Sequence, residues 1–128
     1  MPPTLTLSLP ADPAFAAVAR TAAASVAART GATVDGVEDL RAVAAELFAL
    51  TLDASVEGAT VELSLTYDGP EIAVEARART AADTLPPTDS FAWTILDALA
   101  TDLAARLEDG PGGRTLVLGG RLRLHVPA

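Results

Sequence analysis

The sequence contains no cysteine, no lysine and no asparagine among its 128 residues. Without cysteine the chain can form neither disulfides nor thiolate metal sites, and it has no thiolate nucleophile. Without lysine, both the phosphate-binding lysine of P-loop proteins and the Schiff-base amine of pyridoxal enzymes are excluded. The lack of asparagine removes a carboxamide oxygen that can bind a hard cation such as Mg²⁺.

The charge balance is acidic, with a formal net charge of −8 at pH 7. Sequence-independent affinity for nucleic acids needs clustered basic residues, so we expect no direct binding to DNA or RNA. No apolar run approaches the length of a membrane span, and the N-terminus lacks the pattern of a signal peptide, so we expect a soluble, cytoplasmic protein without membrane contact. Half of the residues are hydrophobic, and residues 1–128 are expected to form a single domain.

The N-terminal part of the chain predicts a strand followed by two helices. Polar and apolar residues alternate over Thr4–Leu9, which is typical of a half-buried strand. Asp12 can cap a first helix that ends near Gly31, and a capping box at Asp35 can start a second helix that runs to about Asp53. The apolar stripes of these helices are Phe15, Val18, Ala19, Ala22 and Val26 in the first, and Leu40, Val43, Ala44, Leu47 and Leu50 in the second.

The middle of the chain predicts a hairpin and a third helix. Val61–Tyr67 and Ile72–Ala78 both alternate, and the turn residues between them indicate a hairpin with one solvent-exposed face. A polar connector over 80–89, which contains Pro86-Pro87, leads to a helix predicted over 90–108. The apolar stripe of that helix is Phe91, Ile95, Leu99, Leu103 and Leu107.

The C-terminal part predicts two further strands. The segment 109–113, rich in glycine, is expected to end the third helix. Strands are predicted over 115–118 and 121–126, with a turn at Gly119-Gly120 between them. The complete order is strand, helix, helix, strand, strand, helix, strand, strand. This order predicts an α+β two-layer sandwich, in which three helices cover a mostly antiparallel five-stranded sheet.

Three stretches of the chain resemble one family. They are Leu9–Ala14 after the first strand, Val37–Glu46 in the second helix, and Leu107–Thr115 before the last strands. With these stretches the chain resembles the anti-sigma-factor serine kinases, small members of the GHKL or histidine-kinase-type ATPase fold, over nearly its whole length. The resemblance implies a GHKL ATPase-like fold. It also implies dimerisation through the first strand and first helix, and action on a sigma factor or its antagonist.

The catalytic motifs of that family are degenerate in this sequence. Glu46 matches the family's glutamate, but Leu50 stands where the magnesium-binding asparagine is expected, and leucine offers no oxygen ligand. The adenine-reading motif corresponds to a stretch without glycine that carries Arg79. At the glycine-rich start of the last helix stand Phe91 and Trp93, where the family keeps room for nucleotide. A vestigial pocket is therefore expected near Glu46, Leu50, Arg79, Phe91 and Trp93.

Glu46 has two interpretations. Asp39, Glu46 and Asp53 recur every seven residues, so they can form an acidic, solvent-exposed edge of the second helix. By resemblance, Glu46 can instead be the general base that activates a serine hydroxyl for phosphoryl transfer.

The remaining candidate side chains are expected to have other roles. Phe91 is expected in the core, because it leads an apolar stripe, whereas Trp93 is expected to face either the vestigial pocket or a partner. In the pocket, Trp93 can also form the wall of a site for a small apolar ligand. His125 is the only histidine, and it is expected on the polar face of the last strand beside Arg121 and Arg123.

The resemblance, together with the degenerate motifs, therefore implies a non-catalytic, anti-sigma-factor-like regulatory protein of bacterial transcription control, without cofactor or metal. Its expected partners are a sigma factor, an anti-sigma antagonist or a second copy of the chain. The alternative is an ATP-dependent serine protein kinase that uses Glu46 and an atypical magnesium site.

Overall fold

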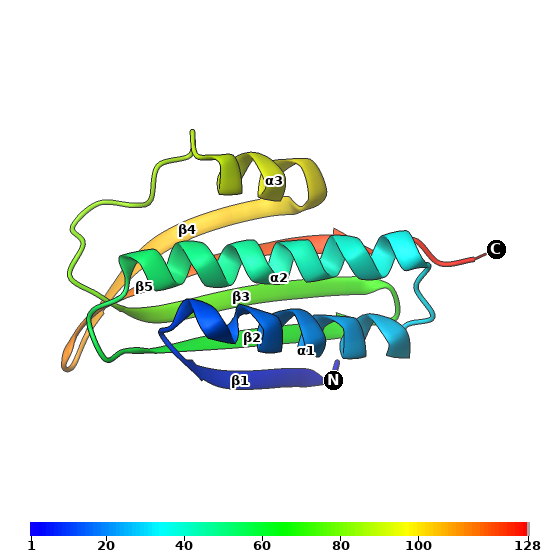
Figure 1. Ribbon diagram of the computed structural model, residues 1–128, viewed down its shortest axis with the longest axis horizontal. Helices are drawn as coiled ribbons and strands as arrows, with labels where there is room; N and C mark the ends of the chain where they lie inside the picture. Colours follow the sequence, from blue (N-terminus) through cyan, green and yellow to red (C-terminus); the bar gives the residue numbers. More distant parts are fainter. Residues whose placement is uncertain (128) are drawn as a thin grey trace.

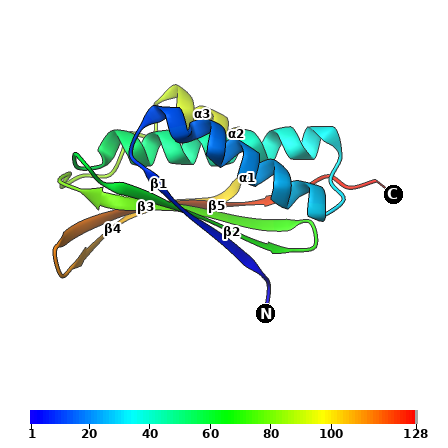
Figure 2. The same ribbon diagram turned by 60° about the horizontal axis from the view of Figure 1, so that its bottom comes forward.

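Three helices cover one face of a five-stranded antiparallel sheet in the computed structural model, which describes residues 1–127 (Figures 1 and 2). The sheet order is β1-β2-β3-β5-β4. The elements are β1 (Thr4–Pro10), the 3-10 turn η1 (Pro13–Phe15), α1 (Ala16–Arg29), α2 (Val34–Ala54), β2 (Thr60–Asp68), β3 (Glu71–Thr80), α3 (Phe91–Leu99), β4 (Thr101–Gly110) and β5 (Gly113–Arg123). The predicted α+β layout and element order are confirmed. Within residues 1–127, no helix is long and apolar enough to cross a membrane.

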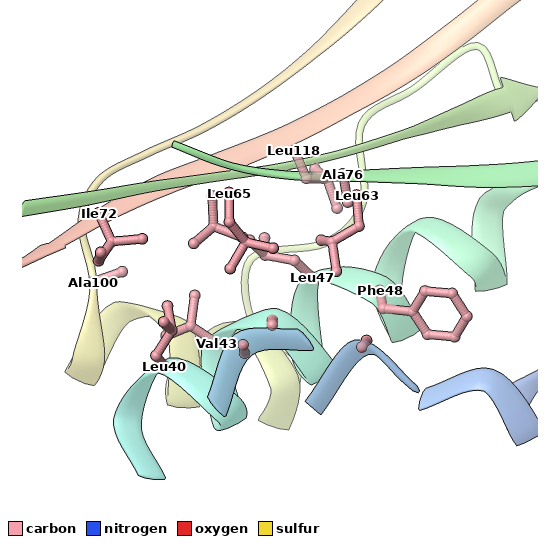
Figure 3. Close-up of a cluster of buried hydrophobic side chains, with 14 of the residues drawn as sticks. Leu40, Val43, Leu47, Phe48, Leu63, Leu65, Ile72, Ala76, Ala100 and Leu118 are labelled. Carbon is pink, nitrogen blue, oxygen red and sulfur yellow. The ribbon is translucent and has the colours of Figure 1, made fainter. Parts of the chain in front are cut away.

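The core lies between α2 and the sheet. Leu40, Val43, Leu47 and Phe48 are buried on α2, in the space between the helices and the sheet (Figure 3). They meet inward-facing side chains of the strands, which alternate with outward-facing polar residues. The buried strand residues of this cluster include Leu63, Leu65, Ile72, Val74, Ala76, Leu116 and Leu118. The predicted apolar stripe of the second helix is thus confirmed, except that Leu50 is only partly buried.

Side-chain caps set the starts of the helices. Asp12 accepts a hydrogen bond from the Ala14 amide, and Ser90 accepts one from the Trp93 amide. The cap of α2 is Thr33, whose hydroxyl accepts from the Gly36 amide at 3.2 Å. The prediction of a capping box at Asp35 is therefore wrong. Asp35 lies in the first turn of α2, where its negative charge suits the helix dipole.

Helix α1 packs through small side chains. Its buried residues are Ala19, Ala23, Val26 and Ala27. Val18, which was predicted in the buried stripe, is exposed. Because alanine dominates every side of this helix, its sequence barely distinguishes the buried face from the exposed one.

The predicted third helix is wrong beyond Leu99. Residues 101–110 form strand β4, and Leu103, Ala105 and Leu107 pack partly buried against the core. Leu99, Leu103 and Leu107 are spaced by four residues, which fits one side of a helix. Because four is also a multiple of two, the same spacing fits one face of a strand. The segment 109–113 is then a hairpin turn, with Gly112 at a φ of 85° after Pro111, which is the arrangement of a type II turn.

The predicted turn at Gly119-Gly120 is also wrong, because β5 runs continuously through both glycines. A Cβ on Gly120 would lie 3.0 Å from Leu103 Cδ2, so glycine here permits the close approach of β4. The number of five strands was correct only because two errors compensated. One strand, β4, was taken for helix, and another, β5, was split into two.

The sheet face that no helix covers carries an ionic network. Glu108 accepts from the Arg77 guanidinium at 2.6 Å and from the Arg106 guanidinium at 2.7 Å. Arg77 and Arg106 both lie opposite Val117 in the strand register. Val117 faces this side of the sheet and is still only 1% exposed. The stems of the two arginines therefore account for the burial of an apolar residue on the open face.

The network predicts a pH dependence of stability. The hydrogen bond from Arg106, together with the positive charges of Arg106 and Arg77, holds the pKa of Glu108 below its ordinary value of 4.5. The ionised Glu108 stabilises the folded state at any pH above the pKa that Glu108 has in the unfolded chain. This stabilisation is lost as the pH falls through the lower pKa that Glu108 has in the folded protein. Glu108→Gln should therefore lower stability at neutral pH and flatten the loss of stability on acidification. Urea unfolding across acidic pH tests this, with exposed Glu57→Gln as control; equal curves for wild type and Glu108→Gln would contradict it.

Candidate functional site

A pocket of about 380 Å³ lies between the C-terminal end of α2, the connector 81–90 and the start of α3. Leu50, Asp53 and Ala54 contribute its α2 side, at positions that share one side of a helix. The connector contributes the opposite side, which includes Pro86-Pro87. The full lining is Leu50, Asp53, Ala54, Ala82, Thr84, Leu85, Pro86, Pro87 and Ser90. Most of these side chains are apolar or small.

Hydrogen bonds fix both ends of the connector. At its start, the buried Thr80 hydroxyl donates to the Ala54 carbonyl at 2.6 Å and accepts from the Ala82 amide at 3.0 Å. The Arg114 guanidinium donates to the Ala82 carbonyl at 3.3 Å. At its end, Ser90 caps α3. One buried hydroxyl thus joins the last turn of α2 to the first residues of the connector.

Of the five residues expected around a vestigial pocket, Leu50 lines this one. Glu46 lies one turn earlier on α2, partly buried, and does not line the pocket. Asp53, about one turn after Leu50, is the carboxylate that lines it. Asp39 and Asp53 are exposed, so two of the three residues of the predicted acidic edge are in solvent.

Arg79 lies elsewhere. It is exposed on the open face of the sheet, and its guanidinium donates to the Pro111 carbonyl at 2.7 Å in the β4–β5 turn. Alternation along β3 explains this position, because Thr80 and Ala78 point towards the helices. The placement of Arg79 near the pocket was wrong. That placement came from the correspondence of this stretch to the family's adenine-reading motif, which does not take account of the face of the strand.

The two aromatic residues of α3 have different environments. Phe91 is 81% exposed, so the prediction that it belongs to the core is wrong. Trp93 is partly buried and packs against the core. Phe91 occupies the first position of α3, directly after the pocket residue Ser90, where the helix has not yet reached the core.

His125 is exposed as predicted, but β5 ends at Arg123, so the prediction that His125 lies on the last strand is wrong. Its backbone carbonyl accepts a hydrogen bond from the Thr33 amide at 2.9 Å. This contact fixes the C-terminal segment at the start of α2 and involves no atom of the imidazole ring.

The chemistry available at the α2–connector pocket is that of a binding surface. Its polar groups are the Asp53 carboxylate and the hydroxyls of Thr84 and Ser90. Ser90 Oγ already accepts from the Trp93 amide. Leu50 presents only carbon atoms. The pocket therefore favours a ligand that is largely apolar.

No protein-family model matches the chain, and no curated protein is significantly similar to it.

A second hollow, on the open face of the sheet, was not anticipated from the sequence. Asp102, Arg106 and Arg121 line it, together with residues of β2 and β3. Asp102 and Arg106 were assigned to a helix, so they could not be placed on the sheet. The alternation of Leu103, Ala105 and Leu107 with polar or small residues fits a strand, but the spacing of Leu103 and Leu107 fits a helix as well, so this local signal does not decide between them.

The connector should loosen when the Thr80 hydroxyl is removed. Thr80→Val keeps the shape of the side chain but leaves the Ala54 carbonyl and the Ala82 amide without their hydroxyl partner, which should cost about 1–3 kcal/mol of unfolding free energy. Thr51→Val is the matched control, since its buried hydroxyl only supplements a helix by bonding the Leu47 carbonyl. Urea unfolding and exchange of the Ala82 amide measure both effects. An equal loss in the two variants would show that Thr80 has no special role.

Proposed function

We propose that this chain is a non-catalytic regulatory protein that acts by binding another protein, in the manner of a degenerate anti-sigma factor. The observation that carries the proposal is Leu50 in the wall of the α2–connector pocket. Phosphoryl transfer depends on a metal ion held by oxygen ligands, and a leucine at this position provides none. The same leucine, with Pro86-Pro87 opposite, makes the pocket suitable for apolar contact with a partner.

Exposed apolar side chains next to the pocket support protein binding. Leu85 lines the pocket and is 48% exposed, and Phe91 follows the lining residue Ser90. Exposed aromatic residues beside an apolar hollow are typical anchors of protein interfaces. We name Leu85, Phe91 and the pocket between them and α2 the connector surface.

The charge of α2 favours a basic partner. The helix carries Asp35, Glu38, Asp39, Glu46 and Asp53 against one arginine, Arg41. Complementary charge accelerates association and selects among partners. By the resemblance, the partner class is a sigma factor or an anti-sigma antagonist, and the element order observed here is the order expected for a GHKL ATPase-like fold.

A second copy of the chain is the other proposed partner. Strand β1 is an edge of the sheet, so one side of its backbone has no neighbouring strand. Ala17, Val18, Thr21 and Ala22 line a shallow, mostly apolar hollow on the outer side of α1. These two features support dimerisation through β1 and α1, the mode that the resemblance implies.

The alternative is an ATP-dependent serine kinase in which Glu46 is the base and the magnesium site is atypical. A nucleotide bound in the α2–connector pocket would then lie nearer to the Asp53 carboxylate than to Glu46, because Asp53 lines the pocket and Glu46 does not. Nucleotide binding therefore separates the two functions.

Calorimetric titration with ATP and ADP, with and without magnesium, should show no saturable binding at millimolar nucleotide. The fluorescence of Trp93, the only tryptophan, gives a parallel signal because the side chain packs at the start of α3. Binding that strengthens with magnesium, and weakens in Asp53→Asn but not in the exposed control Asp39→Asn, would overturn the non-catalytic proposal in favour of the kinase.

Phe91→Ala should weaken partner binding by at least about tenfold, the loss that truncation of an interface anchor typically causes. Val34→Ala is the matched control, since Val34 is 78% exposed at the opposite end of α2. To measure this, the full chain is used to capture its partner, and the captured proteins are identified. The purified sigma factor or antagonist is then titrated against wild type and each variant. Equal affinity of wild type and Phe91→Ala for that partner would exclude the connector surface as the binding site.

A further inference from the structure

The open face of the sheet contains a hollow of about 330 Å³ on the side opposite to the helices. Small residues form its floor, namely Ala73 on β3, Ala104 on β4 and Gly119 on β5. Ala104 and Gly119 are cross-strand partners. Polar and charged side chains surround this floor. They are Ser64, Thr66, Glu75, Asp102, Arg106 and Arg121.

A close contact with β3 disfavours a larger residue in the floor at Gly119. A Cβ on Gly119 would lie 3.2 Å from the Val74 carbonyl oxygen. Glycine in the interior of a strand often marks a place where a ligand or another backbone approaches. Here it leaves the centre of the hollow without a side chain.

Two of the charged residues around the hollow are already paired. Arg106 donates to Glu108 at 2.7 Å, and Glu75 lies 3.6 Å from the Arg77 guanidinium. Asp102 and Arg121 differ from them, because neither forms an ion pair with any residue of the described range 1–127. The hollow is therefore lined by one carboxylate and one guanidinium that have no ion-pair partner within residues 1–127.

The backbone brings Asp102 to the wall of the hollow. Asp102 has a φ of 53°, and the strand register shifts between Thr101 and Ala104. Such a bulge re-aims side chains at the edge of a sheet. Aspartate is among the few residues other than glycine that adopt this left-handed conformation readily. Thr101 is the register partner of Arg121, so the bulge lies next to the guanidinium-bearing residue on β5.

From this arrangement we infer that the open-face hollow binds a small zwitterion of the free amino acid or dipeptide class. The carboxylate of the ligand would accept hydrogen bonds from Arg121, and its ammonium group would donate to Asp102. The hydroxyls of Ser64 and Thr66 line the hollow from β2, on the side opposite to Asp102, where they are hydrogen-bonded to Thr6 and Thr4 of β1. The volume lies at the lower end of the range for small-molecule sites, which fits a ligand of this size.

The charge of the whole chain supports a zwitterion over an anion. With a formal net charge of −8, the protein repels free anions, whereas a ligand without net charge experiences little long-range repulsion. This site lies on the opposite side of the sheet from the connector surface, so its existence does not depend on the proposed regulatory function.

Titration of the full ¹⁵N-labelled chain with each free amino acid and with the dipeptide Ala–Ala should identify a ligand. At least one of these probes should shift the amides of Ala73, Ala104 and Gly119 saturably, while amides of α1 remain unchanged. Blocking either end of that probe, by acetylation of its amine or amidation of its carboxylate, should weaken binding by at least about tenfold, because each block removes one charge-assisted hydrogen bond.

Variants of Asp102 and Arg121 test whether these two side chains bind the ligand. Asp102→Asn retains a residue that tolerates positive φ, and Arg121→Gln retains a long polar side chain; each should weaken binding at least about tenfold. Arg123→Gln is the matched control, since Arg123 is on the same strand and face but pairs with Glu71, and it should bind as wild type. Ala104→Leu should block the site from its exposed edge without altering charge.

Three outcomes would overturn the inference. One is the absence of a saturable shift with every probe at millimolar concentration. A second is binding that Asp102→Asn and Arg121→Gln leave intact. The third is an equal loss in Arg123→Gln, which would indicate nonspecific attraction to the arginines of the sheet.

Discussion

The packing of one face of α2 on the sheet is the interaction on which the rest of the structure depends. Leu40, Val43, Leu47 and Phe48 on this face are all nearly inaccessible to solvent. The helix lies over the middle of the sheet and runs along its strands, with α1 on one side and α3 on the other (Figure 1). Burial of large aliphatic and aromatic side chains is the dominant favourable contribution to folding, and here α2 supplies the largest of them from the helical layer.

This packing divides the molecule into two chemically different sides. The strands alternate, so each places one set of residues under α2 and the other on the open face. The helical side carries the acidic residues of α2 and the apolar connector surface. The open face holds most of the strand arginines, and there Arg77 and Arg106 share Glu108 above Val117. The two candidate binding sites therefore differ in ligand class because they lie on opposite sides of one sheet.

Most of the fold could be predicted from local patterns, and the failures have a physical explanation. Alternation identified β1, β2 and β3, and the 3.6-residue period of the second helix identified its buried face. The spacing of Leu99, Leu103 and Leu107 satisfied a helix and a strand equally. The choice between them depends on the pairing of β4 with β5, where Gly120 also leaves room for Leu103. That contact joins segments distant in sequence, which no local pattern contains.

The sequence by itself determined the layered α+β class and the element order. These features follow from hydrophobic periodicity and residue chemistry, which are properties of the chain. Tertiary structure alone decided which candidates share a site. It separated Arg79 from Leu50, exposed Phe91, and brought Asp102 and Arg121 to one hollow. Strand register and the bulge in β4 set these neighbours, and both arise only when the sheet has formed.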